Sequence, residues 1–126
     1  MLHFPTSSDI TIEINGRPLA VAQRYRAQTT RESRYVEAFG ADEPVGTVGG
    51  RQKHLLELAR VCVLSDQLGD GVNFHELGGF NVVIQKPDRK IIYSGCEWSA
   101  IDETASLGGV VLESVTIAAS KRMEIA

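Results

Sequence analysis

The side chains that most often bind metals are few and scattered in this chain. The histidines are His3, His54 and His75, and no two of them have the i, i+4 spacing of a helical metal site. The cysteines, Cys62 and Cys96, form no C-x-x-C pair. Because a metal site needs three or four converging ligands, one could arise here only if the fold gathered His54, His75 and Cys62. We expect neither a bound metal nor a cofactor.

Patterns typical of nucleophilic or acid–base catalysis are also missing from the sequence. No G-x-S-x-G motif occurs, and Ser94, which precedes Gly95 and Cys96, lies in a segment that reads as a strand. Asp102 and Glu103 are adjacent in a segment that reads as an exposed loop, and neighbouring residues point in different directions. We expect no catalytic residues and no enzymatic activity.

A glycine-rich segment, "AFGADEPVGTVGGRQKH" at residues 38–54, is the most unusual stretch. A Walker-type phosphate loop would close with Lys followed by Ser or Thr and would open a helix. Here Lys53 is followed by His54, and the next residues do not read as a helix. Two interpretations stay open for this long connection: an ordinary hairpin loop, or an arm that contacts a neighbouring subunit.

Length and composition indicate one globular domain. The chain has 126 residues, of which 43% are hydrophobic and 23% charged, with a net charge of −3. The arginines between residues 24 and 34 are partly offset by Glu32 and Glu37, so the sequence does not favour a DNA-reading role. No apolar run approaches the roughly 20 residues of a membrane span. The first nine residues lack the features of a secretory signal, so we expect a cytosolic protein with two reduced, buried thiols.

Alternating apolar and polar residues predict a mainly β chain. In residues 9–14, Ile10, Ile12 and Ile14 alternate with polar residues, and the next four residues are typical of a turn. The most apolar segment, 54–64, fits either a central strand or a buried helix, and β-branched Val61 and Val63 favour the strand. Strands are expected at 9–14, 19–29, 32–39, 54–64, 80–85, 90–98 and 110–119.

Three further segments complete the predicted fold. A short helix is expected from residue 65 to about residue 76, and the polar segment 99–109 reads as a loop. Trp98, with Tyr93 and Phe80, is interpreted as core or subunit contact. Together these elements predict a β-barrel or sandwich of two packed antiparallel sheets with one short flanking α-helix. A small strand-rich chain of this kind exposes strand edges, which favour pairing between subunits unless the sheet closes on itself.

Several segments in this order resemble the tube proteins of contractile phage tails, including those of prophages and tailocins. More distantly they resemble the ring-forming haemolysin-coregulated protein of type VI secretion. The likeness starts with "IEINGRPLA", continues with "FGADEPVG" and a second glycine at Gly49 or Gly50, and then "KHLLELARV". A short helix before "FNVVIQ", then "YSGCEWSAID" and "LESVTIAA", complete it. The resemblance covers residues 10–119. It rests on the order and spacing of these segments, because no single motif is specific to the family.

The resemblance implies a structural role. Proteins of this family form six-membered rings whose inner strands join around one lumen, and the rings stack into a tube. The loop after the third strand and the terminal arms bridge successive rings. By position, residues 40–50 match that bridging loop, with residues 1–9 and 120–126 as candidate terminal arms of a single domain, 1–126. The subunit-contact residues implied are Gly40, Asp42, Glu43, Pro44, Val45, Gly46, Thr47, Val48, Gly49 and Gly50.

The same resemblance implies the partners and the location. They are sheath, baseplate and tape-measure proteins, and DNA that passes through the lumen without sequence-specific binding. The protein would belong to the virion tail, be assembled in the bacterial host cytoplasm and bind no membrane. Two alternatives remain open. One is a tube initiator or baseplate protein of the same fold, and the other is a monomeric barrel that binds a small ligand or builds an enzyme site from distant residues.

Overall fold

The computed structural model describes residues 2, 4–19, 22–62 and 72–126. Within these residues, eight strands form one antiparallel sheet in the order β2-β1-β7-β8-β9-β6-β3, with β10 paired to β8, and β4 and β5 form a separate hairpin. The strands of the first half are β1 (Thr11–Ile14), β2 (Arg17–Pro18), β3 (Ala22–Arg31), β4 (Arg34–Val36) and β5 (Gly46–Val48). Those of the second half are β6 (Gln52–Val61), β7 (Phe80–Gln85), β8 (Lys90–Thr104), β9 (Leu112–Ala119) and β10 (Lys121–Ile125). Two 3-10 turns, η1 (Ser7–Asp9) and η2 (Phe74–Glu76), flank them.

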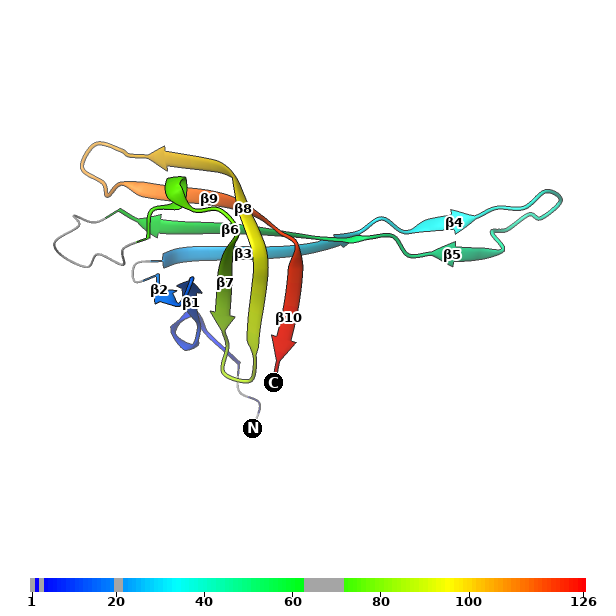
Figure 1. Cartoon of the computed structure of the whole chain (residues 1–126), viewed down its shortest axis with the longest axis horizontal. Coiled ribbons are helices and arrows are strands. Elements are labelled where there is room, and N and C mark those ends of the chain that lie inside the picture. The colour runs from blue at the N-terminus through cyan, green and yellow to red at the C-terminus, as the bar shows by residue number, and fades with distance from the viewer. Residues whose placement is uncertain (1, 3, 20–21, 63–71) are drawn as a thin grey trace.

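The large sheet bends sharply at one level of β8, which gives the protein two layers. Residues 90–96 of β8 pair with β7 and β10, whereas residues 97–104 pair with β9. At the bend, Gly95 has a φ of 61°, which favours glycine, and the Ser120 amide donates to the Ser94 carbonyl at 3.1 Å where β9 gives way to β10. We call β2, β1, β7, residues 90–96 and β10 the lower sheet, and residues 97–104, β9, β6 and β3 the upper sheet (Figure 1).

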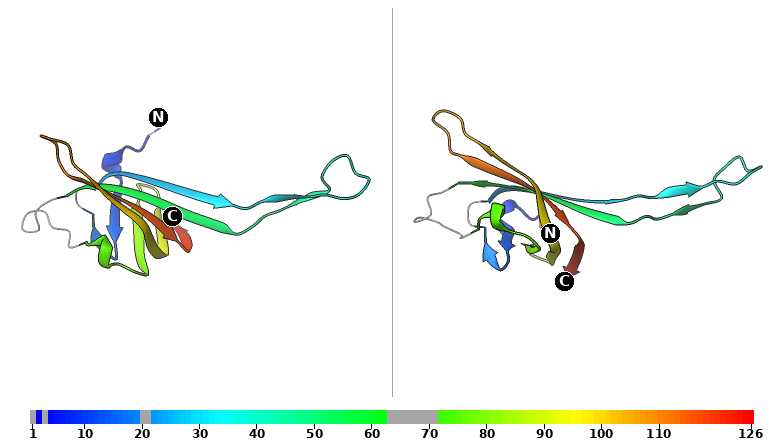
Figure 2. Two further views of the ribbon diagram at one scale, coloured as in Figure 1. Left: turned by 90° about the horizontal axis from the view of Figure 1, so that it is seen from above. Right: turned by 45° about the horizontal axis from the view of Figure 1, so that its top comes forward.

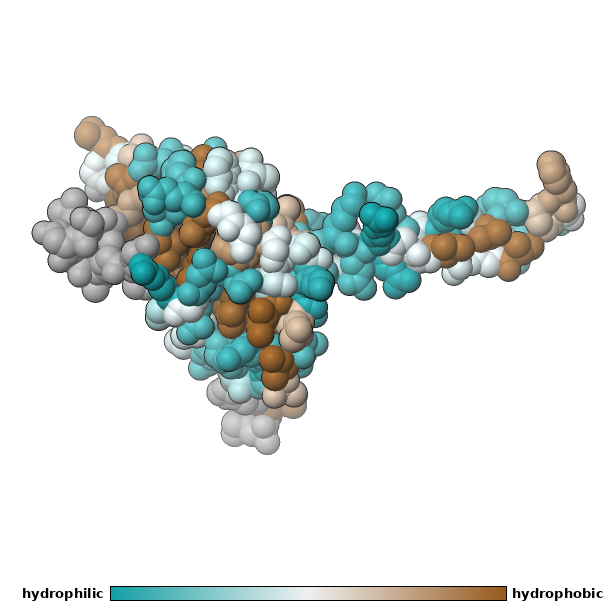
Figure 3. All heavy atoms as spheres, in the orientation of Figure 1, coloured by the Kyte–Doolittle hydropathy of each residue, from teal (hydrophilic) through white to brown (hydrophobic). Residues whose placement is uncertain are grey.

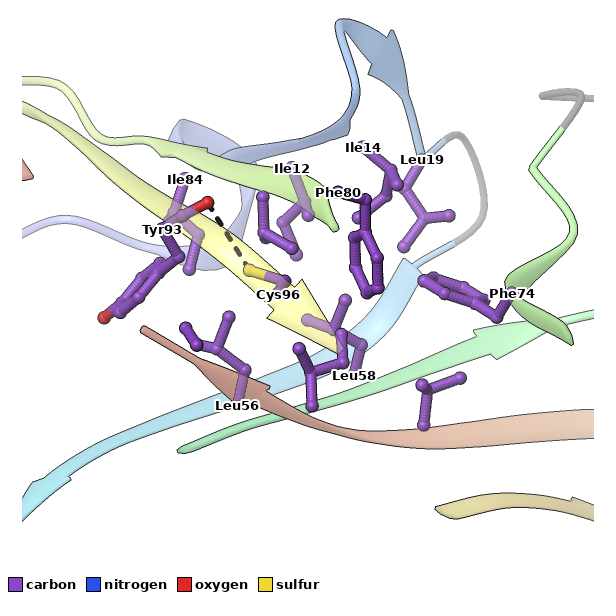
Figure 4. Close-up of a cluster of buried hydrophobic side chains, with 14 of the residues drawn as sticks. Ile12, Ile14, Leu19, Leu56, Leu58, Phe74, Phe80, Ile84, Tyr93 and Cys96 are labelled. Carbon is purple, nitrogen blue, oxygen red and sulfur yellow. Dashed lines mark hydrogen bonds between the residues drawn. The ribbon is translucent and has the colours of Figure 1, made fainter. Parts of the chain in front are cut away.

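The hydrophobic core lies between the two sheets (Figure 4). Alternation places it there: in β7, Phe80, Val82 and Ile84 are buried while Asn81 and Gln85 are exposed. β6 likewise turns His54, Leu56 and Leu58 inward. The largest fully buried side chains are Phe74, Phe80, Ile14, Leu56, Ile84, Ile117, Val82, Val115 and Cys96.

One partly buried arginine closes the core at the end near η2. The Arg60 guanidinium donates to the Glu113 carboxylate on β9, with Nε–Oε1 at 3.0 Å and Nη2–Oε1 at 2.9 Å. Its Nη2 also donates to the Val72 carbonyl at 2.8 Å, and its Cζ lies 4.9 Å from the centre of the Phe74 ring. Arg60 therefore joins β6, β9 and the segment that leads into η2.

The structure confirms the predicted fold class of two antiparallel sheets. Of segment 54–64, which fitted either a strand or a helix, residues 54–61 lie in β6 and residues 63 and 64 lie outside the described residues. Segment 80–85 coincides with β7. Most of the expected helix at 65–76 lies outside the described residues. Its last residues form the 3-10 turn η2, in which the Asn73 side chain accepts a hydrogen bond from the His75 amide.

Two segments are more ordered than the sequence suggested. The prediction of a loop at 99–109 is wrong for residues 99–104, which continue β8, because pairing with β9 satisfies their backbone groups despite modest strand propensity. Residues 121–125, in the segment interpreted as a candidate terminal arm, form β10 and pair with the first half of β8. Both additions lengthen the sheet on either side of its bend.

The expectation of two buried thiols holds for Cys96 but is wrong for Cys62, which is partly exposed. Cys62 follows the last residue of β6, and its thiol faces the exposed Glu103 carboxylate at 3.9 Å instead of the core. Slight burial and the charges of Glu113 and Glu103 raise the pKa of the Cys62 thiol. Deeper burial raises the pKa of Cys96 to about 11.

We therefore expect a thiol reagent such as Ellman's reagent to modify one cysteine of the native protein, Cys62, and to reach Cys96 only after unfolding. Because the thiolate reacts and the pKa of Cys62 is raised, the labelling rate should keep increasing as the pH rises above neutrality. The absorbance of the released thiolate measures both. Cys62→Ser should abolish the fast phase; a fast phase that persists in this variant would contradict the assignment.

Candidate assembly surface

The residues considered for metal binding lie in separate parts of the fold. His54 is buried on β6, and its Nδ1 lies 3.0 Å from the Thr29 hydroxyl. His75 is exposed on η2, with its ring centre 6.2 Å from that of Trp98. Cys62 lies at the opposite end of β6 from His54. Among the described residues, no group of three or more His, Cys, Asp or Glu side chains is arranged to hold a metal ion.

The residues considered for catalysis do not converge either. Asp102 and Glu103 are consecutive in β8, opposite Ser114 and Glu113 of β9, so their side chains point to opposite faces of the strand. Ser94 lies at the bend of β8, where its carbonyl accepts the Ser120 amide and hydroxyl. These positions give Asp102 and Glu103 no shared acid–base site.

The three aromatic residues considered together fall into two environments. Phe80 and Tyr93 are core residues, and the Phe80 ring packs edge-on against Phe74 with centroids 6.3 Å apart. Trp98 is 37% exposed on β8, beside His75 of η2. Trp98 therefore belongs to the surface and the other two to the interior.

A long hairpin extends from the two-layered body (Figures 1 and 2). It comprises residues 32–51, which we call the arm, and it continues the directions of β3 and β6. Arg34, Tyr35 and Val36 of β4 pair antiparallel with Val48, Thr47 and Gly46 of β5. Residues 37–45, the arm tip, connect the two strands.

The arm carries apolar side chains that are largely exposed in the monomer. Phe39 is fully exposed, and Tyr35, Val45 and Val48 are exposed by 67%, 61% and 42%. In Figure 3 the arm is hydrophilic near the body and more hydrophobic toward the tip. Exposed apolar groups gathered on one projection mark an interaction surface.

The contact residues expected from the sequence all lie on the arm. Gly40, with a φ of 80°, is in the tip, whereas Gly46, Thr47 and Val48 form β5. The other members of the set in the tip are Asp42, Glu43, Pro44 and Val45, and Gly49 and Gly50 join β5 to β6. Their contact with another subunit stays a prediction.

Gly49 and Gly50 are required by close approach at the root of the arm. A Cβ at Gly50 would overlap the backbone carbonyl of Glu32 on the opposite side of the hairpin, and one at Gly49 would overlap the Arg31 guanidinium. The flexible Arg31 side chain can move aside, but the Glu32 backbone cannot move without shifting the hairpin. A side chain at Gly50 would therefore change the direction of the arm.

We expect Gly50→Ala to lower the free energy of unfolding by about 1–3 kcal/mol, the usual cost of overpacking. Gly46→Ala is the matched control, because a Cβ there meets nothing within 4 Å. It should change stability by less than about 0.5 kcal/mol, as surface substitutions usually do. Urea unfolding followed by circular dichroism measures both; equal stabilities for the two variants would refute the close-approach argument.

The upper sheet has two free edges in the described part of the chain. β3 pairs only with β6, and residues 97–104 of β8 pair only with β9. Unpaired backbone groups on such edges are ready to pair with another chain. Neither edge is covered by another described strand.

The two free edges carry opposite charges. β3, with the sequence AQRYRAQTTR, contains Arg24, Arg26 and Arg31 and no acidic residue. Residues 97–104, with the sequence EWSAIDET, contain Glu97, Asp102 and Glu103 and no basic residue. Arg26 also lies 3.6 Å from Glu57 of β6, with both side chains well exposed. One edge of the upper sheet is thus basic and the other acidic.

This charge separation is not among the features predicted from the sequence, although its signal is present there. Glu32 and Glu37, which partly offset the arginines near residue 26, lie in the arm and not in β3. The acidic residues Asp102 and Glu103 fall in the segment expected to be a loop. Once residues 90–104 are known to form one strand, all the charged residues of its second half are acidic.

The outer face of the upper sheet, away from the core, is mainly polar, with both small and charged side chains. Side chains alternate between the two faces of a strand, so the residues next to the inward-facing His54, Leu56 and Leu58, and their cross-strand partners, lie on this outer face. They include Gln28, Leu55, Glu57, Thr116, Ala118, Ala100 and Ser114. Among the described residues, the large apolar side chains that this register places on the face are the half-buried Leu55, Val61 and Leu112.

No helix in the described residues is both long enough and apolar enough to span a membrane. No protein-family model and no curated protein matches the chain. Solved structures do match over nearly its whole length.

Three of these structures illustrate the likeness. One is from the tail of an empty gene transfer agent particle with C6 symmetry, with 16% identity, a TM-score of 0.70 and coverage of 96% of this chain and 98% of the other. A second is from the sheath/tube terminator of the extracellular contractile injection system PVC in its extended state, with 9% identity, a TM-score of 0.71 and full coverage of both chains. A third is from the PVC sheath-tube complex, with 7% identity, a TM-score of 0.70 and coverage of 98% and 93%.

At these identities the likeness concerns the fold. The two antiparallel sheets match those of tail and injection-system components over 96% or more of this chain. The resemblance inferred from the order of weak sequence features is therefore confirmed at the level of the backbone: the chain has a tail-tube-like fold.

Proposed function

We propose that the protein is a non-enzymatic structural subunit of a phage or phage-like contractile tail, and that its copies form stacked rings of the inner tube. The observation that carries this proposal is the pair of free, oppositely charged edges on the upper sheet. The shared fold with tail and injection-system components supports it.

The strand directions suit pairing between copies. The upper sheet has four antiparallel strands, β8, β9, β6 and β3, so its two edges run in opposite directions. When β3 of one copy meets the free half of β8 of the next, the new pair is also antiparallel. Basic and acidic side chains then face each other across the junction, which favours the correct partner and register.

Such a contact joins two different surfaces, so it propagates from copy to copy, and in the proposed assembly the rotation between copies closes it into a ring. The C6 symmetry of the similar tail particle supports six copies. The ring places the mainly polar outer face of the upper sheets around a common lumen. Charged residues on that face and its edges are mixed in sign, with Arg26 beside Glu57, so a passing polyanion would find no continuous basic surface to bind.

The arm then serves to stack the rings. The ring axis runs roughly along the strands of the upper sheet, and the arm continues two of these strands beyond the body (Figure 2). It therefore projects from one face of the ring toward the next ring. The proposal includes assembly in the host cytoplasm, residence in the tail, contact with sheath, baseplate and tape-measure proteins, and passage of DNA or an effector through the lumen.

A second role within the same fold is a terminating or baseplate ring that does not polymerise. The similarity of the fold to a sheath/tube terminator component supports this second role. It predicts the same ring contacts with no extended stack. The two roles differ in one observable property, which is the length of the assembly.

The proposal is tested by the mass of the purified protein over a wide range of concentrations, measured by light scattering coupled to size exclusion. Negative-stain images of the largest species give its shape. Six-membered rings and tubes are expected, and rings alone would favour the terminating role. A strict monomer at every concentration would overturn the proposal and leave a monomeric ligand-binding barrel as the better interpretation.

A further inference from the structure

We propose that the acidic, aromatic tip of the arm seats in a basic cleft at the arm root of a copy in the adjacent ring. This inference rests on the proposed function and names the acceptor surface for the arm. Its occupant is a second copy of this chain.

The cleft lies between β3 and β6 on one side and the β7–β8 hairpin and β10 on the other. Its volume is about 770 Å³, and its mouth is open to solvent. Lys86 and Arg122 supply the basic side chains of the cleft, and no described lining residue is a carboxylate. Arg26 borders the cleft through its place on β3, but its side chain lies beside Glu57 on the outer face of the sheet. Its deeper wall includes the rings of His54 and Tyr93, which pack edge-on with centroids 6.2 Å apart.

The positive charge of the cleft is only partly compensated within the monomer. Arg122 lies 3.9 Å from Glu124. Lys86 forms no ion pair with the described residues within 4.0 Å. The cleft therefore presents an aromatic interior and a basic rim, which suits an aromatic side chain flanked by carboxylates.

The arm tip has the complementary composition. It carries Glu37, Asp42 and Glu43, and residues 35–50 include no Lys or Arg. Phe39 stands fully exposed among them. An exposed aromatic residue on a projecting hairpin is the kind of anchor that fills a pocket at a protein interface.

The arm cannot fill the cleft of its own chain. The cleft adjoins the root of the arm, and residues 32–41 carry the tip about 33 Å away at roughly 3.3 Å per residue. Figure 1 shows the arm leading directly away from the body. Only another copy can bring a tip to this cleft.

The dimensions favour a copy in the next ring. β6 has ten residues, so the body measures about 33 Å along its long strands. A copy displaced by one body length along the arm therefore has its own arm root at the level of the first copy's tip. The cleft lies at that root, so stacking rings in one orientation brings tip and cleft together.

Charge reversal tests the contact. Asp42→Lys/Glu43→Lys should leave rings intact but prevent them from stacking, and Lys86→Glu/Arg122→Glu should do the same from the other side. The variant with all four substitutions restores the complementarity with the signs exchanged, and it should stack again. Ring mass is measured by light scattering and tube length by negative-stain microscopy, with circular dichroism to establish that each variant is folded.

Glu13→Lys/Glu76→Lys changes the net charge as much as the tip variant but lies outside the arm and the cleft, so it should stack like the wild type. If the wild type forms tubes and the folded four-substitution variant does not, this inference is overturned while the proposed function stands. Tubes of unchanged length from either reversed variant would also overturn it. A wild-type protein that forms no ring refutes the proposed function itself.

Cross-linking locates the contact independently of its strength. In a Cys62→Ser background, a mixture of Phe39→Cys and Gln52→Cys proteins should give a mixed disulfide dimer on oxidation, because Gln52 lines the cleft. The buried Cys96 should remain unmodified. Mass spectrometry that finds only Phe39→Cys self-dimers, or no cross-link in assembled tubes, would contradict the proposed acceptor.

Discussion

Reversing the basic edge of the upper sheet is expected to abolish ring formation. In Arg24→Glu/Arg26→Glu, β3 presents two carboxylates to the acidic half of β8 in the next copy, where the wild type presents two guanidinium groups. Like charges facing each other across an interface cost several kcal/mol. About 3 kcal/mol at each junction would weaken it more than about a hundredfold. Light scattering should find a monomer at concentrations where the wild type forms rings.

The reciprocal variant, Asp102→Arg/Glu103→Arg, should fail in the same way when it is alone. Mixed in equal amounts, the two variants should assemble again, because each provides the edge that the other needs. The restored rings must alternate the two chains, so they must contain an even number of subunits. Native mass spectrometry reads this composition directly.

A charge-matched control separates edge pairing from net charge. Lys90→Glu/Lys121→Glu alters two exposed lysines of the lower sheet, away from both free edges, and should leave the rings intact. If the two folded charge-reversed variants form no mixed rings, the two edges do not meet in the assembly. The loss of the exposed Arg26–Glu57 pair should contribute at most about 1 kcal/mol to monomer stability.

The largest effect on monomer stability is expected from Phe80→Ala. Phe80 is 1% exposed at the start of β7, where it packs against Phe74 between the two sheets (Figure 4). Removing a buried ring loses its transfer free energy and leaves a cavity, at a cost of about 3–5 kcal/mol. Urea unfolding followed by circular dichroism should show this as a large decrease in the midpoint.

The chain offers a matched control for that substitution. Phe39→Ala removes the same atoms from a fully exposed position on the arm, so it should change the free energy of unfolding by less than about 0.5 kcal/mol. If Phe80→Ala is too unstable to purify, Phe80→Leu should show a smaller loss in the same direction. Equal stabilities for Phe80→Ala and Phe39→Ala would mean that Phe80 does not occupy the core.

Much of the fold was predictable because its signals are local. Period-2 alternation in β1 and β7, and turn residues after Ile14 and Gln85, identify strands without reference to the rest of the chain. The mainly β composition then leaves few ways to bury the apolar faces, and two packed sheets is one of them. The order of the weak features also led to a tail-tube-like fold, which the solved structures confirm.

Other features of the fold could not be predicted from the sequence, because each depends on residues that are distant in the sequence and adjacent in the structure. Residues 99–104 read as a loop, since Ser, Ala, Asp and Glu have modest strand propensity, yet their partner β9 makes them a strand. Cys62 lies in the most apolar segment, 54–64, yet its thiol emerges beside Glu103 just after the end of β6. The absence of a Cβ at Gly50 is required by the Glu32 backbone across the hairpin, not by the sequence neighbours of Gly50.

The sequence by itself determined most of the strands, which of their faces is apolar, and that one long connection is rich in glycine and acidic residues. Only the tertiary structure decided where β8 bends, which two edges of the upper sheet stay free and that one is basic and the other acidic. It also decided that a basic cleft opens at the root of the arm. The reason is physical: alternation and turn chemistry act between near neighbours in the chain, whereas edges, bends and clefts arise from pairing between residues far apart in it.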